Sequence, residues 1–111
     1  MPFESGNLFA TIPADLPEEL VQTIVSAASL RVERIVSRGH ASPAGFWYDQ
    51  PQNEWVLLVS GAARVRFEGE AESVAMKPGD YLHVAARRRH RVEWTAPGVD
   101  TVWLAIHYAQ A

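Results

Sequence analysis

Apolar residues in the first third of the chain recur at the spacing of a helix. They stand four residues apart, at Leu16, Leu20, Ile24 and Ala28. A helix would place these side chains on one face. The preceding Asp15 can cap such a helix, Glu18 can complete a capping box, and a proline between them is tolerated in the first turn. The pattern predicts one amphipathic helix that ends near Leu30 and covers one face of a sheet.

Beyond this segment apolar and polar residues alternate, which is the period of half-buried strands. Residues 63–68 and 90–94 alternate strictly, whereas residues 101–108 form a nearly continuous apolar run, typical of a strand covered on both faces. Prolines and glycines separate the segments. The predicted strands are residues 30–36, 46–48, 54–59, 63–68, 72–76, 80–84, 90–94 and 101–108. Short strands at this spacing indicate an all-β sandwich or barrel.

The chain of 111 residues has the length of one domain that buries a single core. We expect residues 1–29 to form an N-terminal segment with its helix and residues 30–111 to form a barrel on which this helix packs. Together they make one structural domain. The sequence contains no cysteine, which excludes disulfides and thiolate zinc sites and fits a reducing cytosol.

Charge and hydropathy argue against nucleic acids and membranes as partners. The net charge is −3, and the one dense basic run, residues 87–91, lacks the interleaved aromatic residues of a nucleic-acid platform. No stretch approaches the about 20 apolar residues that span a bilayer. The start Met1-Pro2-Phe3-Glu4 has neither the basic residues nor the apolar run of a secretory signal. We therefore expect a cytoplasmic protein.

Two ionisable residues open predicted strands. Glu54 opens residues 54–59 and His90 opens residues 90–94. In each strand the following residues on the same face are apolar. We therefore expect both polar groups to enter the interior at strand ends, where a carboxylate and an imidazole can meet inside a small barrel.

The spacing around these residues resembles the two motifs of the cupin family. Six residues separate Glu54 from Gly61, as in the first motif, and Gly79 precedes His90 by eleven positions, as in the second. The resemblance covers about residues 30–108 and includes small cupins that carry Phe-Trp-Tyr-Asp-Gln before the motif glutamate. It implies an all-β fold, the cupin double-stranded β-helix or jelly-roll barrel, here with one N-terminal helix. Cupins include dioxygenases, isomerases and decarboxylases, so the resemblance leaves open whether this chain is an enzyme.

Typical cupins hold a divalent metal with three histidines and one glutamate, but the paired histidines of the first motif are missing here. Depending on the spacing chosen, their positions hold Trp47 and Asp49, or Tyr48 and Gln50. Residue by residue, the resemblance implies a metal site formed by Asp49, Glu54 and His90. The ion would be Mn, Fe, Ni or Zn, and the carboxylate ligands favour Mn²⁺ or Fe²⁺.

Three further residues are predicted to line a ligand pocket: Tyr48, Arg88 and His40. Tyr48 offers a phenol, and Arg88, on the same side of its strand as His90, offers a planar fork for a carboxylate or phosphate. His40 lies in a loop near the barrel mouth. The alternatives are that Arg88 lies on a solvent-exposed edge strand, where its charge protects against aggregation, and that His40 is an ordinary loop residue. We expect His107, at the end of the chain, to be a core or interface histidine.

The leading hypothesis is a small cupin that binds a divalent metal and a small, anionic or oxygen-rich molecule inside the barrel, with or without metal-dependent catalysis. A second hypothesis is a metal-free module that binds or senses a small ligand. A third is a structural homodimer in which Glu54 and His90 satisfy each other's hydrogen bonds in an apolar interior. The segment Phe46-Trp47-Tyr48 would be a ligand-stacking wall or a core and dimer patch. No catalytic residue can be named.

Overall fold

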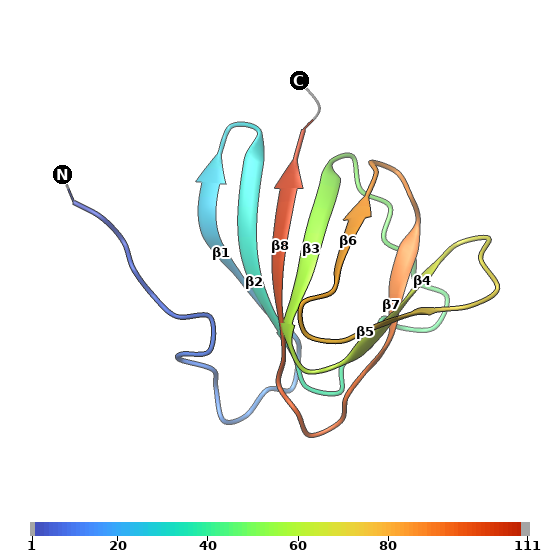
Figure 1. Ribbon diagram of the computed structural model, residues 1–111, viewed down its shortest axis with the longest axis horizontal. Coiled ribbons are helices and arrows are strands. Elements are labelled where there is room, and N and C mark those ends of the chain that lie inside the picture. The colour runs from blue at the N-terminus through green and yellow to red at the C-terminus, as the bar shows by residue number, and fades with distance from the viewer. Residues whose placement is uncertain (1, 110–111) are drawn as a thin grey trace.

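The computed structural model describes residues 2–109, which form eight strands in two sheets (Figure 1). The strands are β1 (Leu20–Ala27), β2 (Leu30–Ser37), β3 (Asn53–Ser60), β4 (Ala63–Phe67), β5 (Val74–Met76), β6 (Tyr81–Val84), β7 (His90–Thr95) and β8 (Thr101–Tyr108). The larger sheet has the order β1-β2-β8-β3-β6 and the smaller one β5-β4-β7. All neighbouring strands are antiparallel. The predicted all-β fold, a double-stranded β-helix, is therefore confirmed.

The predicted N-terminal helix is wrong. Residues 20–27 form β1, which pairs with β2 through a two-residue turn, and residues 2–109 contain no helix. Four of the eight residues of β1 are β-branched, and such residues are stiff in helices and favoured in strands. A bulge between Thr23 and Val25 also breaks the alternation that would have identified a strand. In the same described range, no helix is long and apolar enough to cross a membrane.

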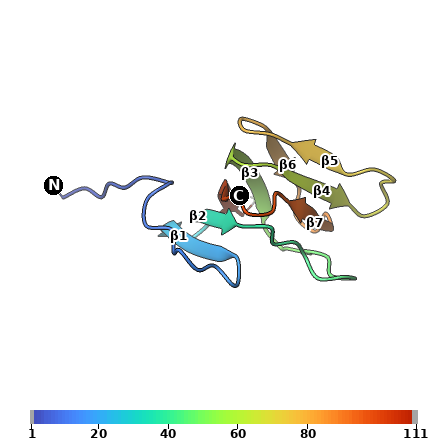
Figure 2. The ribbon, with the colours of Figure 1, turned by 90° about the horizontal axis from the view of Figure 1, so that it is seen from below.

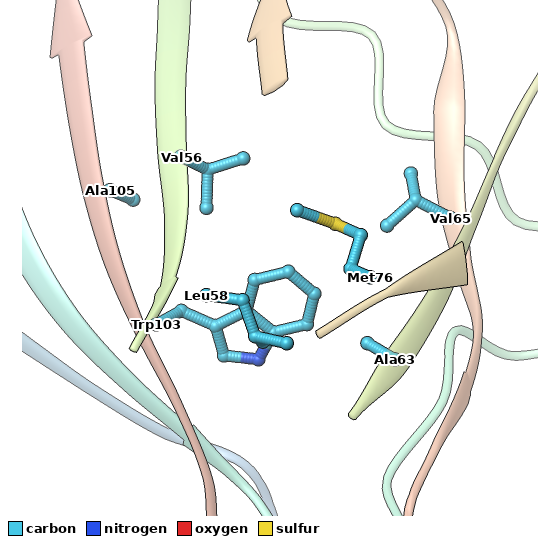
Figure 3. Packing of buried hydrophobic residues seen from close by; sticks show 7 residues of the cluster. All are labelled: Val56, Leu58, Ala63, Val65, Met76, Trp103 and Ala105. Carbon is cyan, nitrogen blue, oxygen red and sulfur yellow. The ribbon is translucent and has the colours of Figure 1, made fainter. Parts of the chain in front are cut away.

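The hydrophobic core lies between the two sheets. Figure 3 shows side chains of β3 and β8 on one side meeting those of β4 and β5 on the other. The cluster consists of Val56, Leu58, Ala63, Val65, Met76, Trp103 and Ala105. Leu58 is fully buried. The alternating positions of the strands therefore point inward to one shared core.

The smaller sheet covers only part of the larger one. In Figure 2, β1 lies beyond the three strands of the smaller sheet. Val21 and Val25 of β1 are consequently 51% and 49% exposed. Residues 2–19 continue past this edge (Figure 1), and they are held where the Arg34 guanidinium donates to the carbonyls of Leu8 and Ala10. The space between the sheets is thus less covered on the side of β1.

Gly61, the motif glycine between β3 and β4, makes a close approach to β8. Its φ is 90°, and a Cβ added there would lie 2.6 Å from the Cα of Thr101. Only glycine tolerates both the left-handed conformation and this contact. Gly61 therefore allows the chain to leave the larger sheet and enter the smaller one while packed against β8.

Candidate functional site

A cavity of about 220 Å³ lies between the sheets, next to the core. Its apolar lining comes from both sheets: Ile35, Val56, Val65, Leu82, Val92 and Trp103. Its polar lining consists of Glu19, Arg31, Glu33, Tyr48, Gln50, Glu54, His90 and His107. Polar groups at this depth need partners or a ligand, because burying them unpaired is costly.

Glu54 and His90 meet in this cavity. Glu54 is the second residue of β3 and His90 the first residue of β7, and they are 7% and 8% exposed. The Nε2 atom of His90 lies 3.5 Å from Oε1 of Glu54. The Nδ1–H group of His90 donates to the carbonyl of Arg88 at 2.9 Å. If the ring were neutral, its proton would be on Nδ1, and the Nε2 lone pair would face the Glu54 carboxylate. The geometry therefore favours the imidazolium, in which Nε2 also carries a proton.

The pKa of His90 reflects this balance. Burial lowers the pKa, but the Glu54 carboxylate and the carbonyl of Arg88 outweigh burial, and the pKa of His90 is raised. An imidazole held in this way, with a fixed orientation and a carboxylate beside it, is suited to hold or deliver a proton.

A second imidazole–carboxylate pair, which sequence reasoning missed as part of the site, lies beside the first. His107, only 5% exposed, stands directly opposite Glu54 on the neighbouring strand β8. Its Nε2–H donates to Oε1 of Glu33 at 3.0 Å and lies 3.9 Å from Oε2 of Glu54. Glu33, His107, Glu54 and His90 therefore form one continuous array across three strands of the larger sheet and one of the smaller.

The signal for this second pair was present in the sequence only in part. His107 shares its face of the last strand with Trp103 and Ala105, so the expectation of a buried histidine agrees with its position. What the sequence lacks is the register that sets β8 between β2 and β3. Without that register, neither Glu33 nor Glu54 could be assigned to His107.

Tyr48 also lines the cavity. Its backbone forms a two-way bridge with His90, and its ring stacks on that imidazole with centroids 5.4 Å apart. Burial, together with the charges of Glu19 and Glu54, raises the pKa of Tyr48. Its neighbour Phe46 is 43% exposed, so the aromatic segment is divided between cavity and surface, and its role in a homodimer stays a prediction.

Asp49 is not brought to the cavity. It is exposed and forms an ion pair with Arg87 at 3.3 Å. Its neighbours Tyr48 and Gln50 both line the cavity, so the residue between them points outward. The predicted convergence of Asp49 with Glu54 and His90 is therefore wrong, and Tyr48 and Gln50 occupy the inward positions that correspond to the paired histidines.

Arg88 and His40 are also outside this cavity. The Arg88 guanidinium lies over the Phe67 ring and donates to the carbonyl of Glu68 at 2.7 Å. The sequence placed Arg88 on the same side of a strand as His90, but β7 begins only at His90 and Arg87 has a φ of 66°. The alternation of side chains along the strand therefore does not extend to Arg88. His40 contacts the carbonyl of Pro17 at 3.2 Å, beside a separate cleft. Both predictions of cavity-lining residues are therefore corrected.

The donor set does not fit the divalent metal that the sequence resemblance implies. Across residues 2–109, no group of three or more His, Cys, Asp or Glu side chains is arranged to hold a metal ion. The Nε2 atoms of His90 and His107 already lie beside carboxylate oxygens, at 3.5 Å from Glu54 and 3.0 Å from Glu33. At the inward motif positions, the phenol of Tyr48 and the amide of Gln50 are weaker ligands than imidazoles.

Two buried atoms of the cavity-lining residues have no hydrogen-bond partner among the described residues: Oε1 of Gln50 and Nδ1 of His107. His107 directs its Nε2 atom to Glu33, so its Nδ1 atom is the ring nitrogen left without a partner. Buried polar atoms without partners are rare and costly in folded proteins. Both atoms therefore call for a hydrogen-bonding partner.

Comparison with known proteins gives a family and a fold. A family model described as Cupin domain matches residues 35–107, whereas no curated protein matches the chain. Among solved structures, a Ralstonia eutropha protein described as a candidate mannose-6-phosphate isomerase is 51% identical, with a TM-score of 0.93 over 96% of this chain and 99% of that chain.

Two more distant structures share the fold alone. A cupin superfamily protein from Desulfitobacterium hafniense is 18% identical, with a TM-score of 0.75 over 98% of this chain and 94% of that chain. An RmlC-like cupin family protein from Methanocaldococcus jannaschii, with a double-stranded β-helix fold, is 14% identical, with a TM-score of 0.70 over 89% of this chain and 87% of that chain.

Proposed function

Because the chain belongs to the cupin domain family, whose model covers most of its length, we propose that the cavity between its sheets binds a small polar molecule through protein side chains, without a metal ion. The observation that carries this proposal is the pair of buried polar atoms without a partner, Oε1 of Gln50 and Nδ1 of His107, among the described residues that line the cavity. The neighbouring imidazoles and carboxylates already engage each other, whereas these two atoms have no partner among the described residues.

The size of the cavity limits the ligand. Its volume of about 220 Å³ is below the range of roughly 300–1,000 Å³ that is usual for drug-sized ligands. The polar array occupies one part of the lining and branched apolar side chains the rest. The cavity therefore suits a small molecule with a polar side and a C–H side.

A ligand screen with metal-depleted protein tests this proposal. After dialysis against a chelator, metal content is measured by elemental analysis, and binding of small polyols, sugars, amines and acids is followed by saturation-transfer NMR. We expect at least one compound to bind in the absence of metal. Gln50→Leu should weaken that binding about tenfold, which corresponds to one lost hydrogen bond.

Asp49→Asn is the matched control, because Asp49 is adjacent to Gln50 but lies outside the cavity. It should leave binding unchanged. Binding that requires a stoichiometric metal, and that is lost together with the metal in Glu54→Ala, would contradict the proposal and restore the metal hypothesis.

A second candidate function is proton transfer on the bound molecule. It is supported by the oriented pair of His90 and Glu54, and by the similarity to a protein described as a candidate mannose-6-phosphate isomerase. Isomerisation between an aldose and a ketose moves a proton between adjacent carbons, which needs a base and an acid within reach of the substrate. The cavity is lined by two imidazoles and three carboxylates, which supply candidates for these roles.

Exchange with solvent distinguishes turnover from binding. In D₂O an isomerase would incorporate deuterium next to the carbonyl of its substrate, which NMR detects directly. We expect Glu54→Gln and His90→Asn to abolish incorporation, while Asp49→Asn retains it. A compound that binds in the cavity but never exchanges its protons would restrict the function to binding.

A further inference from the structure

We infer that the cavity selects an uncharged, polyhydroxylated molecule over its phosphorylated or carboxylated counterparts. This inference rests on the proposed binding function and specifies its ligand class. It differs from the anionic ligand expected from the sequence, because that expectation depended on Arg88, which lies outside the cavity.

The charges around the cavity oppose an anion. Three carboxylates line it, those of Glu19, Glu33 and Glu54, against two cationic groups among the described lining residues, the Arg31 guanidinium and the imidazolium that Glu54 favours at His90. The Arg31 charge is already engaged, because its Nε atom lies 2.9 Å from Oε2 of Glu33. An anionic group placed beside these carboxylates would be repelled, and repulsion inside a protein is screened much less than at its surface.

The basic run that could have attracted an anion points away from the cavity. Arg87 pairs with Asp49 at 3.3 Å, and Arg89 pairs with Glu68 at 2.8 Å. Arg88, between them, lies over the Phe67 ring outside the cavity. The positive charge of residues 87–89 is thus balanced by surface carboxylates and an aromatic ring.

The unpartnered atoms specify what the ligand must provide. Oε1 of Gln50 is an uncharged acceptor that needs a hydrogen-bond donor, and Nδ1 of His107 also has no partner among the described residues. The Glu54 oxygens retain accepting capacity, since they lie 3.5 Å and 3.9 Å from their imidazole neighbours. Acceptors of this kind on the lining residues, Oε1 of Gln50 and the Glu54 carboxylate, match the hydroxyl groups of a polyol or free sugar.

The apolar part of the lining accounts for the remainder of such a molecule. Val56 and Val65 face each other from the two sheets, with Leu82 beside them. A polyol or sugar has C–H groups that can contact these side chains while its hydroxyls face the polar array. A phosphorylated sugar, in contrast, would have to keep its phosphate outside the cavity.

Matched ligand pairs test the inference. Calorimetry with metal-depleted protein compares glycerol with glycerol 3-phosphate, and mannose with mannose 6-phosphate and mannosamine, at low and at physiological ionic strength. We expect a neutral member to bind at least tenfold more tightly than its phosphorylated counterpart at both ionic strengths. Glu33→Gln should reduce this ratio because it removes one repelling carboxylate, whereas Glu68→Gln, which changes a surface carboxylate outside the cavity, should not.

The possible outcomes separate this inference from the proposed function. Tighter binding of a phosphorylated compound than of its neutral counterpart, or weaker binding of the amine than of the neutral sugar, would overturn the inference and leave a metal-free binding cavity. If no compound of any charge binds in this set or in the wider screen, the proposed function itself fails. A ratio that Glu33→Gln and Glu68→Gln change equally would also overturn the inference, because it would not arise in the cavity.

Discussion

Replacing Gly61 with alanine should destabilise the protein more than the same replacement at Gly69. Both glycines have left-handed backbones, with φ values of 90° and 89°. They differ in their surroundings, because a Cβ at Gly61 would lie 2.6 Å from the Cα of Thr101, whereas a Cβ at Gly69 would meet nothing within 4 Å. The pair therefore separates backbone strain from steric overlap.

The expected magnitudes follow from these two costs. A left-handed conformation costs a residue with a Cβ roughly 1–2 kcal/mol, and both variants bear this cost. At Gly61 the overlap with the backbone of β8 adds about 1–3 kcal/mol, the usual range for overpacking. The Thr101 backbone cannot move away freely, because this residue is fully buried and paired with β2. We therefore expect the two variants to differ in free energy of unfolding by about 1–3 kcal/mol.

Urea unfolding followed by tryptophan fluorescence measures this difference, and Trp103 in the core supplies the signal. Both variants should keep the m-value of the parent protein, since the surface exposed on unfolding does not change. Equal destabilisation by the two substitutions would refute the close approach of Gly61 to β8. A larger loss at Gly69 than at Gly61 would refute it as well.

Three further predictions concern the core and the site. Leu58→Ala should lower the free energy of unfolding by about 3 kcal/mol in urea titrations, because a fully buried leucine leaves a cavity. In NMR titrations His90 should show a pKa above its ordinary value, and Glu54→Gln should lower it. Because the pKa of His90 is higher in the folded than in the unfolded state, His90 should stabilise the protein fully below about pH 6.5, the unfolded-state pKa. This stabilisation should be lost as pH rises through the folded-state pKa. A pH-stability profile unchanged by Glu54→Gln would contradict this. Asp49→Ala should change stability by less than about 1 kcal/mol, because its ion pair with Arg87 is exposed.

The fold could be predicted from the sequence wherever one residue period was unbroken. Residues 63–68 and 90–94 alternate in sequence and contain β4 and most of β7, with a register shift in their pairing near Trp94, which is 41% exposed. The apolar run of residues 101–108 forms β8 inside the larger sheet. For residues 20–27, the local spacing of apolar residues alone predicted a helix. Their pairing with β2 decided otherwise, and such pairing contributes more than weak local propensity.

The site could be predicted from the sequence only for side chains at regular strand positions. Glu54 and His90 each belong to a strand, so the alternation of inward and outward side chains placed them in the interior. Asp49 and Arg88 lie in loops outside the named strands, where side chains do not alternate regularly between two faces. Their positions depend on turns and on local ion pairs.

The sequence by itself determined the motif spacings, the inward faces of the strands and, through them, an all-β barrel with a carboxylate and an imidazole inside. Only the tertiary structure decided which polar groups share the cavity. His107 meets Glu54 because β8 lies between β2 and β3 in one particular register. That register depends on contacts between residues far apart in the chain, which a one-dimensional pattern does not contain. The same contacts place the arginines outside and leave acceptors inside, and the proposed ligand class rests on this arrangement.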